Sequence, residues 1–161
     1  MITYRAAKFD DVEKIHKLLN DYAKAGLMLP RSRNAIYENL RDYIVAMQGS
    51  HLVGCGALHF VWDRLAEIRS LAVDPELKCT GIGRNIVELL EKEGIERGVK
   101  MFFTLTYQPG FFAKCNYIET AKEKLPQKVW KECVYCPQYP YCNEIAFVKT
   151  TVDYQPGDIL F

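Results

Sequence analysis

The sequence has no long hydrophobic run, no excess of charge of one sign and no internal repeat, and each absence excludes a class of protein. A membrane-spanning helix needs about 18 consecutive apolar residues, and no run in the chain approaches that length. Lys and Arg total 21 against 20 for Asp and Glu, whereas proteins that bind nucleic acid usually carry a clear basic excess. Met1–Arg5 lead into polar sequence without the apolar core of a signal peptide. We therefore expect neither a membrane nor a nucleic acid as partner.

The residues that are present suit a folded, cytoplasmic protein of one domain spanning residues 1–161. The 161 residues are 49% hydrophobic and 25% charged, which is ordinary for a globular domain. No linker or low-complexity stretch interrupts the chain, so a single core is expected. Six cysteines without a leader indicate the reducing cytosol rather than a disulfide framework.

The hydrophobic pattern predicts an α/β protein with a mixed sheet and helices on both of its faces. The expected strands are 2–6, 43–47, 52–62, 66–73, 100–106 and 144–149. A first helix is expected to start at Asp10, and three further helices are expected at 34–41, 82–97 and 109–114. Asp10 and Glu13 have the spacing of a capping box at the start of the first helix. The long helix has an apolar stripe and is followed by Gly98 as a stop signal; the stripe consists of Ile82, Ile86, Leu89 and Leu90.

A glycine loop between a strand and the long helix is the segment with the clearest chemistry. The strand 66–73 is followed by Asp74-Pro75 and then by the segment 78–84, Lys-Cys-Thr-Gly-Ile-Gly-Arg. A helix N-terminus attracts anions, and glycines let a phosphate approach the backbone. Lys78 and Arg84 add positive charge. On the glycines alone, an ordinary strand-to-helix turn is an equal alternative.

After Leu-Ala-Val-Asp-Pro, the chain has a basic residue at 78 and glycines at 81 and 83. This spacing resembles the acetyl-CoA loop of the GNAT N-acetyltransferases. The resemblance implies the GNAT acyl-CoA N-acyltransferase fold and acetyl-CoA as co-substrate. It also implies the residues that bind acetyl-CoA: Leu71, Ala72, Val73, Lys78, Cys79, Thr80, Gly81, Ile82, Gly83 and Arg84.

Further segments resemble the short, stand-alone N-acetylglutamate synthases of bacterial arginine biosynthesis. They are Leu-Pro-Arg-Ser at 29–32, the strand 66–73, and the stretches 104–112, 125–130 and 133–144. This resemblance implies transfer of the acetyl group to the α-amine of L-glutamate by direct attack.

Direct attack needs a base for the ammonium proton and a donor for the developing oxyanion. Glu67 occupies the strand position where related histone acetyltransferases have their catalytic glutamate, which implies that it is the base. The alternative is a half-exposed strand residue paired with Arg69. The backbone N–H of Leu71, where the family's strand bulges, is the implied oxyanion donor.

The leaving thiolate either takes a proton from a tyrosine of the short helix, as the resemblance to many family members implies, or needs no protein acid. Phe112 fills the position where many family members have this tyrosine. Tyr107 and Tyr117 are the nearby alternatives, and each is also compatible with a core position.

Glutamate brings two carboxylates, which favour arginine side chains. Arg31 and Arg69 are the best candidates, and Lys128 is the third. Ser32 either contributes a hydroxyl to the substrate or caps the following helix.

Cys133, Cys136 and Cys142 invite a zinc interpretation. A structural zinc site needs four ligands, and this segment supplies three. We therefore expect packed thiols and no metal.

Two alternative functions fit the same residues. In the first, the enzyme acetylates glutamine, another amino acid, a polyamine or a protein amine instead of glutamate. In the second, the protein is a non-catalytic CoA-binding sensor. The oligomeric state is left open, with a homodimer as one option.

Overall fold

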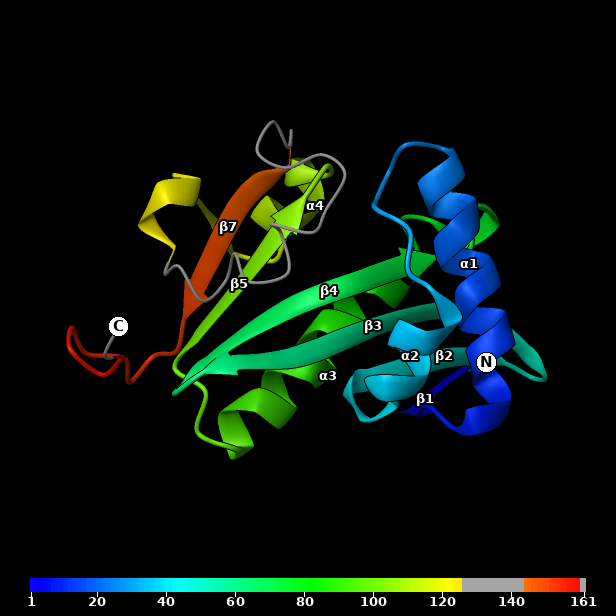
Figure 1. Cartoon of the computed structure of the whole chain (residues 1–161), viewed down its shortest axis with the longest axis horizontal. Helices are drawn as coiled ribbons and strands as arrows, with labels where there is room; N and C mark the ends of the chain where they lie inside the picture. Colours follow the sequence, from blue (N-terminus) through cyan, green and yellow to red (C-terminus); the bar gives the residue numbers. More distant parts are fainter. Residues whose placement is uncertain (126–143, 160–161) are drawn as a thin grey trace. The chain divides into compact units, whose positions relative to one another are not determined.

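The computed structural model describes residues 1–125 and 144–159 (Figure 1). Its strands form a mixed sheet in the order β1-β2-β3-β4-β5-β7-β6, in which β5 runs parallel to β4 and antiparallel to β7. The chain forms two compact units, Met1–His59 with Ile68–Glu93 and Phe60–Glu67 with Gly94–Phe161, and β3 and β4 contribute residues to both. The strands and α-helices are β1 (Ile2–Ala6), α1 (Val12–Lys24), α2 (Arg33–Glu38), β2 (Tyr43–Gln48), β3 (His51–Trp62), β4 (Leu65–Val73), α3 (Ile82–Glu96), β5 (Met101–Thr106), α4 (Pro109–Lys114), β6 (Ile118–Thr120) and β7 (Ile145–Thr150).

In the first unit, helices α1 and α2 cover one face of the strands (Figure 1). The apolar face of α1 is buried as its periodicity predicts, while Leu18 is only partly covered. The side chains that form this core are Val12, Ile15, Leu19, Tyr22 and Ile36 from the helices and Tyr43, Val45, Met47, Cys55, Ala57 and Ala72 from the strands.

Helix α3 covers the opposite face, where two glycines of β3 let it lie directly on the backbone. A methyl group built at Gly56 would stand 2.6 Å from Cγ2 of Ile86, which no real contact permits. Because successive residues of a strand point to opposite faces, Gly54 and Gly56 meet α3 while Cys55 and Ala57 meet α1 and α2. The prediction of helices on both faces is therefore confirmed in this unit.

The predicted apolar stripe of α3 is wrong at one residue, Leu89. Leu89 is 36% exposed, whereas Val87 is buried beside Ile86 and Leu90. Gly83 and Glu91 are buried as well, so the buried face is centred near Gly83 and Leu90, which puts Val87 inside it and Leu89 outside it.

In the second unit, β5 lies between β4 and β7. Phe102, Phe103 and Phe112 are buried in this unit, and Phe111 is half-buried. Strand β6, which pairs with β7, was not predicted, because three residues at a sheet edge, two of them exposed, carry no periodic pattern.

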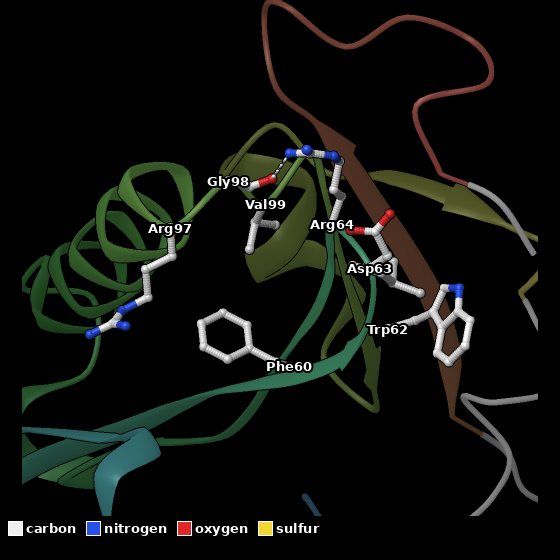
Figure 2. A pocket seen from close by; sticks show the side chains of 8 residues that line it. Phe60, Trp62, Asp63, Arg64, Arg97, Gly98 and Val99 are labelled. Carbon is white, nitrogen blue, oxygen red and sulfur yellow. Dashed lines mark hydrogen bonds between the residues drawn. The ribbon is translucent and has the colours of Figure 1, made fainter.

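The second unit has a hollow of about 420 Å³ between the β3–β4 turn and the segment after α3 (Figure 2). Arg64, at the turn with φ +60°, donates from Nη1 to the carbonyl of Gly98 at 3.2 Å. The rings of Phe60 and Trp62 are half exposed at its rim. None of the predicted site residues lines this hollow.

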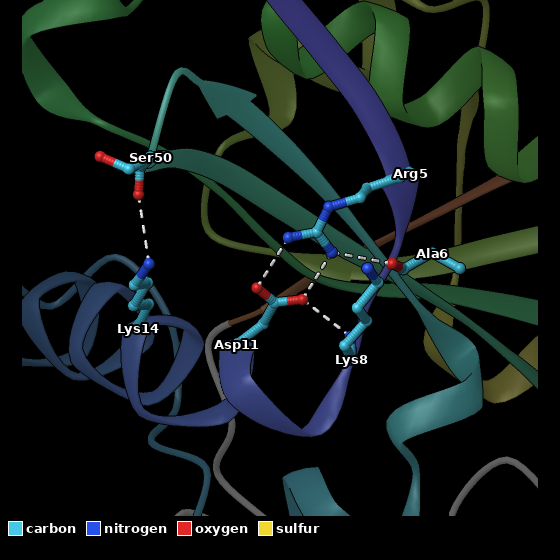
Figure 3. A network of polar contacts seen from close by, with 6 residues as sticks. All are labelled: Arg5, Ala6, Lys8, Asp11, Lys14 and Ser50. Carbon is cyan, nitrogen blue, oxygen red and sulfur yellow. Dashed lines mark hydrogen bonds and ion pairs between the residues drawn. The ribbon is translucent and has the colours of Figure 1, made fainter.

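The start of α1 differs from the predicted capping box of Asp10 and Glu13. A 3-10 turn, Phe9–Asp11, precedes the helix, and Asp11 is the residue that organises it. The Asp11 carboxylate accepts two hydrogen bonds from Arg5 at 2.7 and 3.0 Å and one from the backbone N–H of Lys8 at 2.7 Å (Figure 3). Because Arg5 lies on β1, the helix start is set by a contact with a neighbouring strand.

Candidate functional site

The glycine loop lies in the first unit, where β4 leads into α3. Asp74 caps the turn Pro75–Leu77 by accepting from the backbone N–H of Glu76 at 3.0 Å. The Thr80 hydroxyl donates to the carbonyl of Leu77 and closes the next turn. Cys79 and Gly81 both have positive φ angles, +65° and +91°. These contacts bring the chain sharply round into the first turn of α3.

The loop presents backbone and positive charge to solvent. Lys78, Cys79, Thr80, Gly81 and Arg84 are exposed, and no atom lies within 4 Å of a Cβ built at Gly81. The N-terminus of the 15-residue α3 therefore meets open space, as an anion site requires.

Ile82 and Gly83 differ from the other loop residues because both are buried. The side chain of Ile82 faces Gly54. Only the main chain of Ile82 is thus suited to the predicted contact with acetyl-CoA.

Strand β4 departs from regular strand geometry at Ser70. Ser70 has φ +56°, a left-handed conformation that a serine rarely adopts. The thiol of Cys55 donates to the Ser70 carbonyl at 3.4 Å. Burial raises the pKa of this thiol to about 12, and a hydrogen bond from the backbone of Ala72 acts in the opposite direction. Cys55 is therefore a neutral thiol that holds the chain on both sides of Leu71.

Tyr22 of α1 holds the end of the same segment. Its hydroxyl donates to the carbonyl of Val73 at 2.7 Å and accepts from the Val73 N–H at 3.0 Å. Both main-chain polar groups of Val73 therefore have a partner within the chain, and the role of Val73 in binding acetyl-CoA stays a prediction. The backbone N–H of Ala72 likewise has a partner, the thiol of Cys55, so Leu71 is the remaining candidate for an N–H contact with acetyl-CoA.

The charges of Arg31 and Arg69 both act on one buried side chain of the first unit, Tyr43. Burial raises the pKa of Tyr43, a hydrogen bond to Ser70 opposes this, and the charges of Arg31 and Arg69 also lower it. The Tyr43 hydroxyl donates to Oγ of Ser70 at 3.2 Å. Arg69 is only 9% exposed, which is uncommon for an arginine. The Tyr43 hydroxyl is thus bonded to Ser70 and lies within electrostatic reach of both predicted arginines.

Tyr43, Ser70, Tyr22 and Cys55 were not among the predicted site residues. Each acts through a partner that lies 15 to 51 positions away in the sequence. No local motif contains such pairs, so the sequence offered no signal for them.

Two other polar residues have structural partners. Oγ of Ser32 accepts from the backbone N–H of Ala35 at 3.1 Å, so the alternative in which Ser32 caps α2 is confirmed. Nδ1 of His59 lies 2.8 Å from a carboxylate oxygen of Asp42. Asp42 immediately precedes Tyr43, so this pair adds to the polar groups on that part of the sheet.

The second unit contains Glu67 and the tyrosines proposed as acids. Glu67 is half-buried on β4 and pairs in register with Phe103 of β5. Tyr117 is buried, and its ring packs edge-on against Phe112 at 5.3 Å between centroids. It is therefore a core aromatic residue. Tyr107 follows β5 and is half-buried, so it remains the candidate acid.

The remaining predicted residues are Lys128, Cys133, Cys136 and Cys142, and all four lie outside the described residues. In residues 1–125 and 144–159, no group of three or more His, Cys, Asp or Glu side chains could hold a metal ion. The same parts of the chain contain no helix long and apolar enough to cross a membrane.

The model of the acetyltransferase (GNAT) family matches residues 12–117, which belong to both units. The chain belongs to this family. It is therefore an acetyl-CoA-dependent N-acetyltransferase, and acetyl-CoA is its co-substrate. This agrees with the mixed sheet and with the open glycine loop.

Two curated GNAT relatives cover most of the chain. An uncharacterized N-acetyltransferase of Chlorobaculum tepidum is 44% identical over 91% of this chain and 94% of its own. An amino-acid acetyltransferase of Mycobacterium tuberculosis is 34% identical over 80% of this chain and 75% of its own.

Two solved structures share the GNAT fold of this chain. Rv2747 from M. tuberculosis, in complex with CoA and NLQ, has a TM-score of 0.81 and 27% identity over 93% of this chain and 99% of that one. N-acetylglutamate synthase from Neisseria gonorrhoeae, complexed with coenzyme A and N-acetyl-glutamate, has a TM-score of 0.84 at 22% identity. This chain covers 35% of that longer protein, so the second likeness concerns the fold alone.

Proposed function

We propose that this GNAT enzyme transfers the acetyl group of acetyl-CoA to the α-amine of L-glutamate, the first step of arginine biosynthesis. The observation that carries the proposal is that the positive charges of Arg31 and Arg69 both lower the pKa of the buried Tyr43 hydroxyl. An acceptor with two carboxylates needs more than one cationic side chain, and arginine suits planar carboxylates best. The relatives named amino-acid acetyltransferase support the same substrate class.

The residues of the glycine loop hold the pyrophosphate of acetyl-CoA, which supplies the activated acetyl thioester. Arg31 and Arg69 bind the carboxylates of glutamate and orient its amine. Glu67 accepts a proton from the ammonium, which makes the nitrogen a nucleophile. A C–N bond forms and the C–S bond breaks, while the N–H of Leu71 donates to the oxygen that gathers negative charge. The thiolate leaves and takes a proton from Tyr107 or from water.

The function is tested by measuring thiol release from acetyl-CoA with a panel of amines. Glutamate should be turned over well, and glutamine, aspartate, spermidine and a peptide amine much less. Turnover only with amines other than glutamate would assign another acceptor to the same fold. CoA binding without any turnover would identify the protein as a sensor.

The role of Arg69 is tested by Arg69→Ala. Losing one charge-assisted hydrogen-bonding partner costs about 1.5 to 3 kcal/mol, so KM for glutamate should rise about 10- to 150-fold. KM for acetyl-CoA should change little. Arg33→Ala is the matched control, because Arg33 lies on the exposed side of α2 and pairs with Glu13 at 2.7 Å. An unchanged glutamate dependence in Arg69→Ala would exclude the role.

A further inference from the structure

Tyr22 lies on α1, yet it contacts both parts of the first unit that are predicted to bind acetyl-CoA, the end of β4 and the glycine loop. It is buried, and its hydroxyl bonds to the carbonyl and the N–H of the same residue, Val73, at 2.7 and 3.0 Å. A hydroxyl has one proton to donate and lone pairs to accept with, so one side chain satisfies both backbone groups. The last residue of β4 is thereby attached to a helix.

The ring of the same side chain lies beneath the first cation of the glycine loop. Nζ of Lys78 stands 5.3 Å from the centre of the Tyr22 ring, which is within the range of a cation–π interaction. Lys78 is exposed at the opening of the loop, and a long lysine side chain in that position has many conformations. The ring therefore restricts the ammonium group to one side of the loop.

The Tyr22 hydroxyl binds Val73, which lies two positions after Leu71, the proposed oxyanion donor. Ser70 has φ +56°, and such a conformation persists only where the surroundings hold it. Cys55 binds the Ser70 carbonyl on one side of Leu71, and Tyr22 binds both polar groups of Val73 on the other. A donor stabilises an oxyanion only when its direction is set in advance.

Tyr22 stays a neutral hydroxyl at ordinary pH, as this double role requires. Burial raises its pKa, and the hydrogen bond with Val73 offsets this in part. A tyrosinate could accept the N–H of Val73 but could not donate to its carbonyl.

We propose that Tyr22 is a positioning residue with two separable roles: its hydroxyl orients the Leu71 amide for the transition state, and its ring orients Lys78 for the pyrophosphate. The inference rests on the proposed role of Leu71 and holds whichever amine is the acceptor. It predicts that loss of the hydroxyl and loss of the ring affect different kinetic quantities.

The test compares Tyr22→Phe with Tyr22→Leu. Phenylalanine keeps the ring beneath Lys78 and loses the hydroxyl, so kcat should fall about 10- to 100-fold while the Kd of CoA, measured by calorimetry, stays within about twofold. Leucine loses both groups, so the Kd of CoA should also rise about two- to fivefold. The pH dependence of kcat/KM should be unchanged in both variants, because the proton acceptor is untouched. Rates are expressed per CoA-binding site, which removes unfolded molecules from the comparison.

Tyr4→Phe is the matched control for losing a tyrosine hydroxyl. The Tyr4 hydroxyl accepts from Nδ2 of Asn85 at 3.0 Å on the exposed side of α3, away from β4. This variant should keep the wild-type kcat. A fall in kcat equal to that of Tyr22→Phe would overturn the proposal.

A second pair of variants keeps the proposal testable if the Tyr22 variants are unstable. Serine in Cys55→Ser keeps a donor for the Ser70 carbonyl and an acceptor for the Ala72 N–H, the two contacts on either side of Leu71. Alanine in Cys55→Ala removes both. The alanine variant should lose kcat without losing CoA affinity, and the serine variant should recover most of it.

Two results would overturn the inference. One is a wild-type kcat in Tyr22→Phe, and the other is a parallel loss of kcat and CoA affinity in every variant, which marks a structural role. If wild-type enzyme does not acetylate glutamate, the proposed function fails by itself, and the same comparison is made with the best amine of the panel.

Discussion

Replacement of Asp11 by asparagine should destabilise the protein, because this carboxylate connects β1 to the start of α1. Asp11 is 3% exposed and accepts three hydrogen bonds, two from Arg5 and one from the Lys8 backbone (Figure 3). Asparagine has nearly the same shape and keeps one carbonyl oxygen, so the Lys8 contact can survive. The ion pair with Arg5 cannot.

The expected loss is about 2 kcal/mol of unfolding free energy. A hydrogen bond to a charged group contributes about 1.5 to 3 kcal/mol, and the Arg5 side chain is 36% exposed, so solvent screening reduces the upper figure. For a chain of this size, about 2 kcal/mol lowers Tm by about 4 to 8 °C. Urea unfolding followed by circular dichroism measures the free energy directly.

The destabilisation should also depend on pH in one direction. The hydrogen bond from Arg5 holds the pKa of Asp11 below its ordinary value of 3.8. A lowered pKa in the folded state contributes stability above the unfolded-state pKa and loses it as the pH falls through the folded-state pKa. The difference between wild type and Asp11→Asn should thus be constant from about pH 6 to 8 and shrink below about pH 4.

The control is Asp21→Asn on the same helix. Asp21 pairs with Lys17 at 2.9 Å, and their side chains are 50% and 79% exposed, so its loss should cost no more than about 0.5 kcal/mol. Equal losses at the two positions would refute the reasoning. A difference between wild type and Asp11→Asn that persists unchanged at acid pH would refute it as well.

Two further predictions concern the base and the packing of α3. Glu67→Gln should lower kcat at least about 100-fold with CoA affinity unchanged; unchanged turnover at both neutral and high pH would remove Glu67 from the mechanism. Gly56→Ala places a methyl 2.6 Å from Ile86 and should cost about 1 to 3 kcal/mol in urea unfolding. Gly110→Ala, with no atom within 4 Å of the added methyl, is its control, and equal stability of the two variants would contradict direct packing of α3 on β3.

Elements with local signals could be predicted from the sequence almost to the residue. The helix 109–114 matches α4 at both ends, because Pro109 suits the first helical position. Gly98, with φ +96°, lies just beyond α3, where a residue of positive φ commonly ends a helix. The hairpin of β2 and β3 turns at Gly49 with φ +61°. Each signal is contained within a few consecutive residues.

In the candidate site, too, features with a local sequence signal could be predicted and features that depend on distant residues could not. The glycine loop was predictable because its backbone chemistry is carried by one continuous segment, whereas the roles of Arg31 and Arg69 follow from the proposed substrate and stay predictions. The Tyr43 hydroxyl, on which the charges of Arg31 and Arg69 both act, was not predictable, because Tyr43 meets Ser70 across 27 positions of sequence. Helix α1 was placed correctly by its apolar face, but its start was not, because Asp11 is held by a residue of β1.

The end of β4 shows why a motif can be recognised without its physical cause. The family resemblance implied an irregular strand at Leu71, yet neither Ser70 nor its neighbours favour a positive φ. The contacts that hold this conformation come from Cys55 on β3 and Tyr22 on α1. The geometry of the proposed oxyanion donor is thus specified outside the strand that carries it. The segment 66–73 transplanted without these two side chains should relax toward an ordinary extended strand, and its Leu71 amide would lose the orientation that catalysis needs.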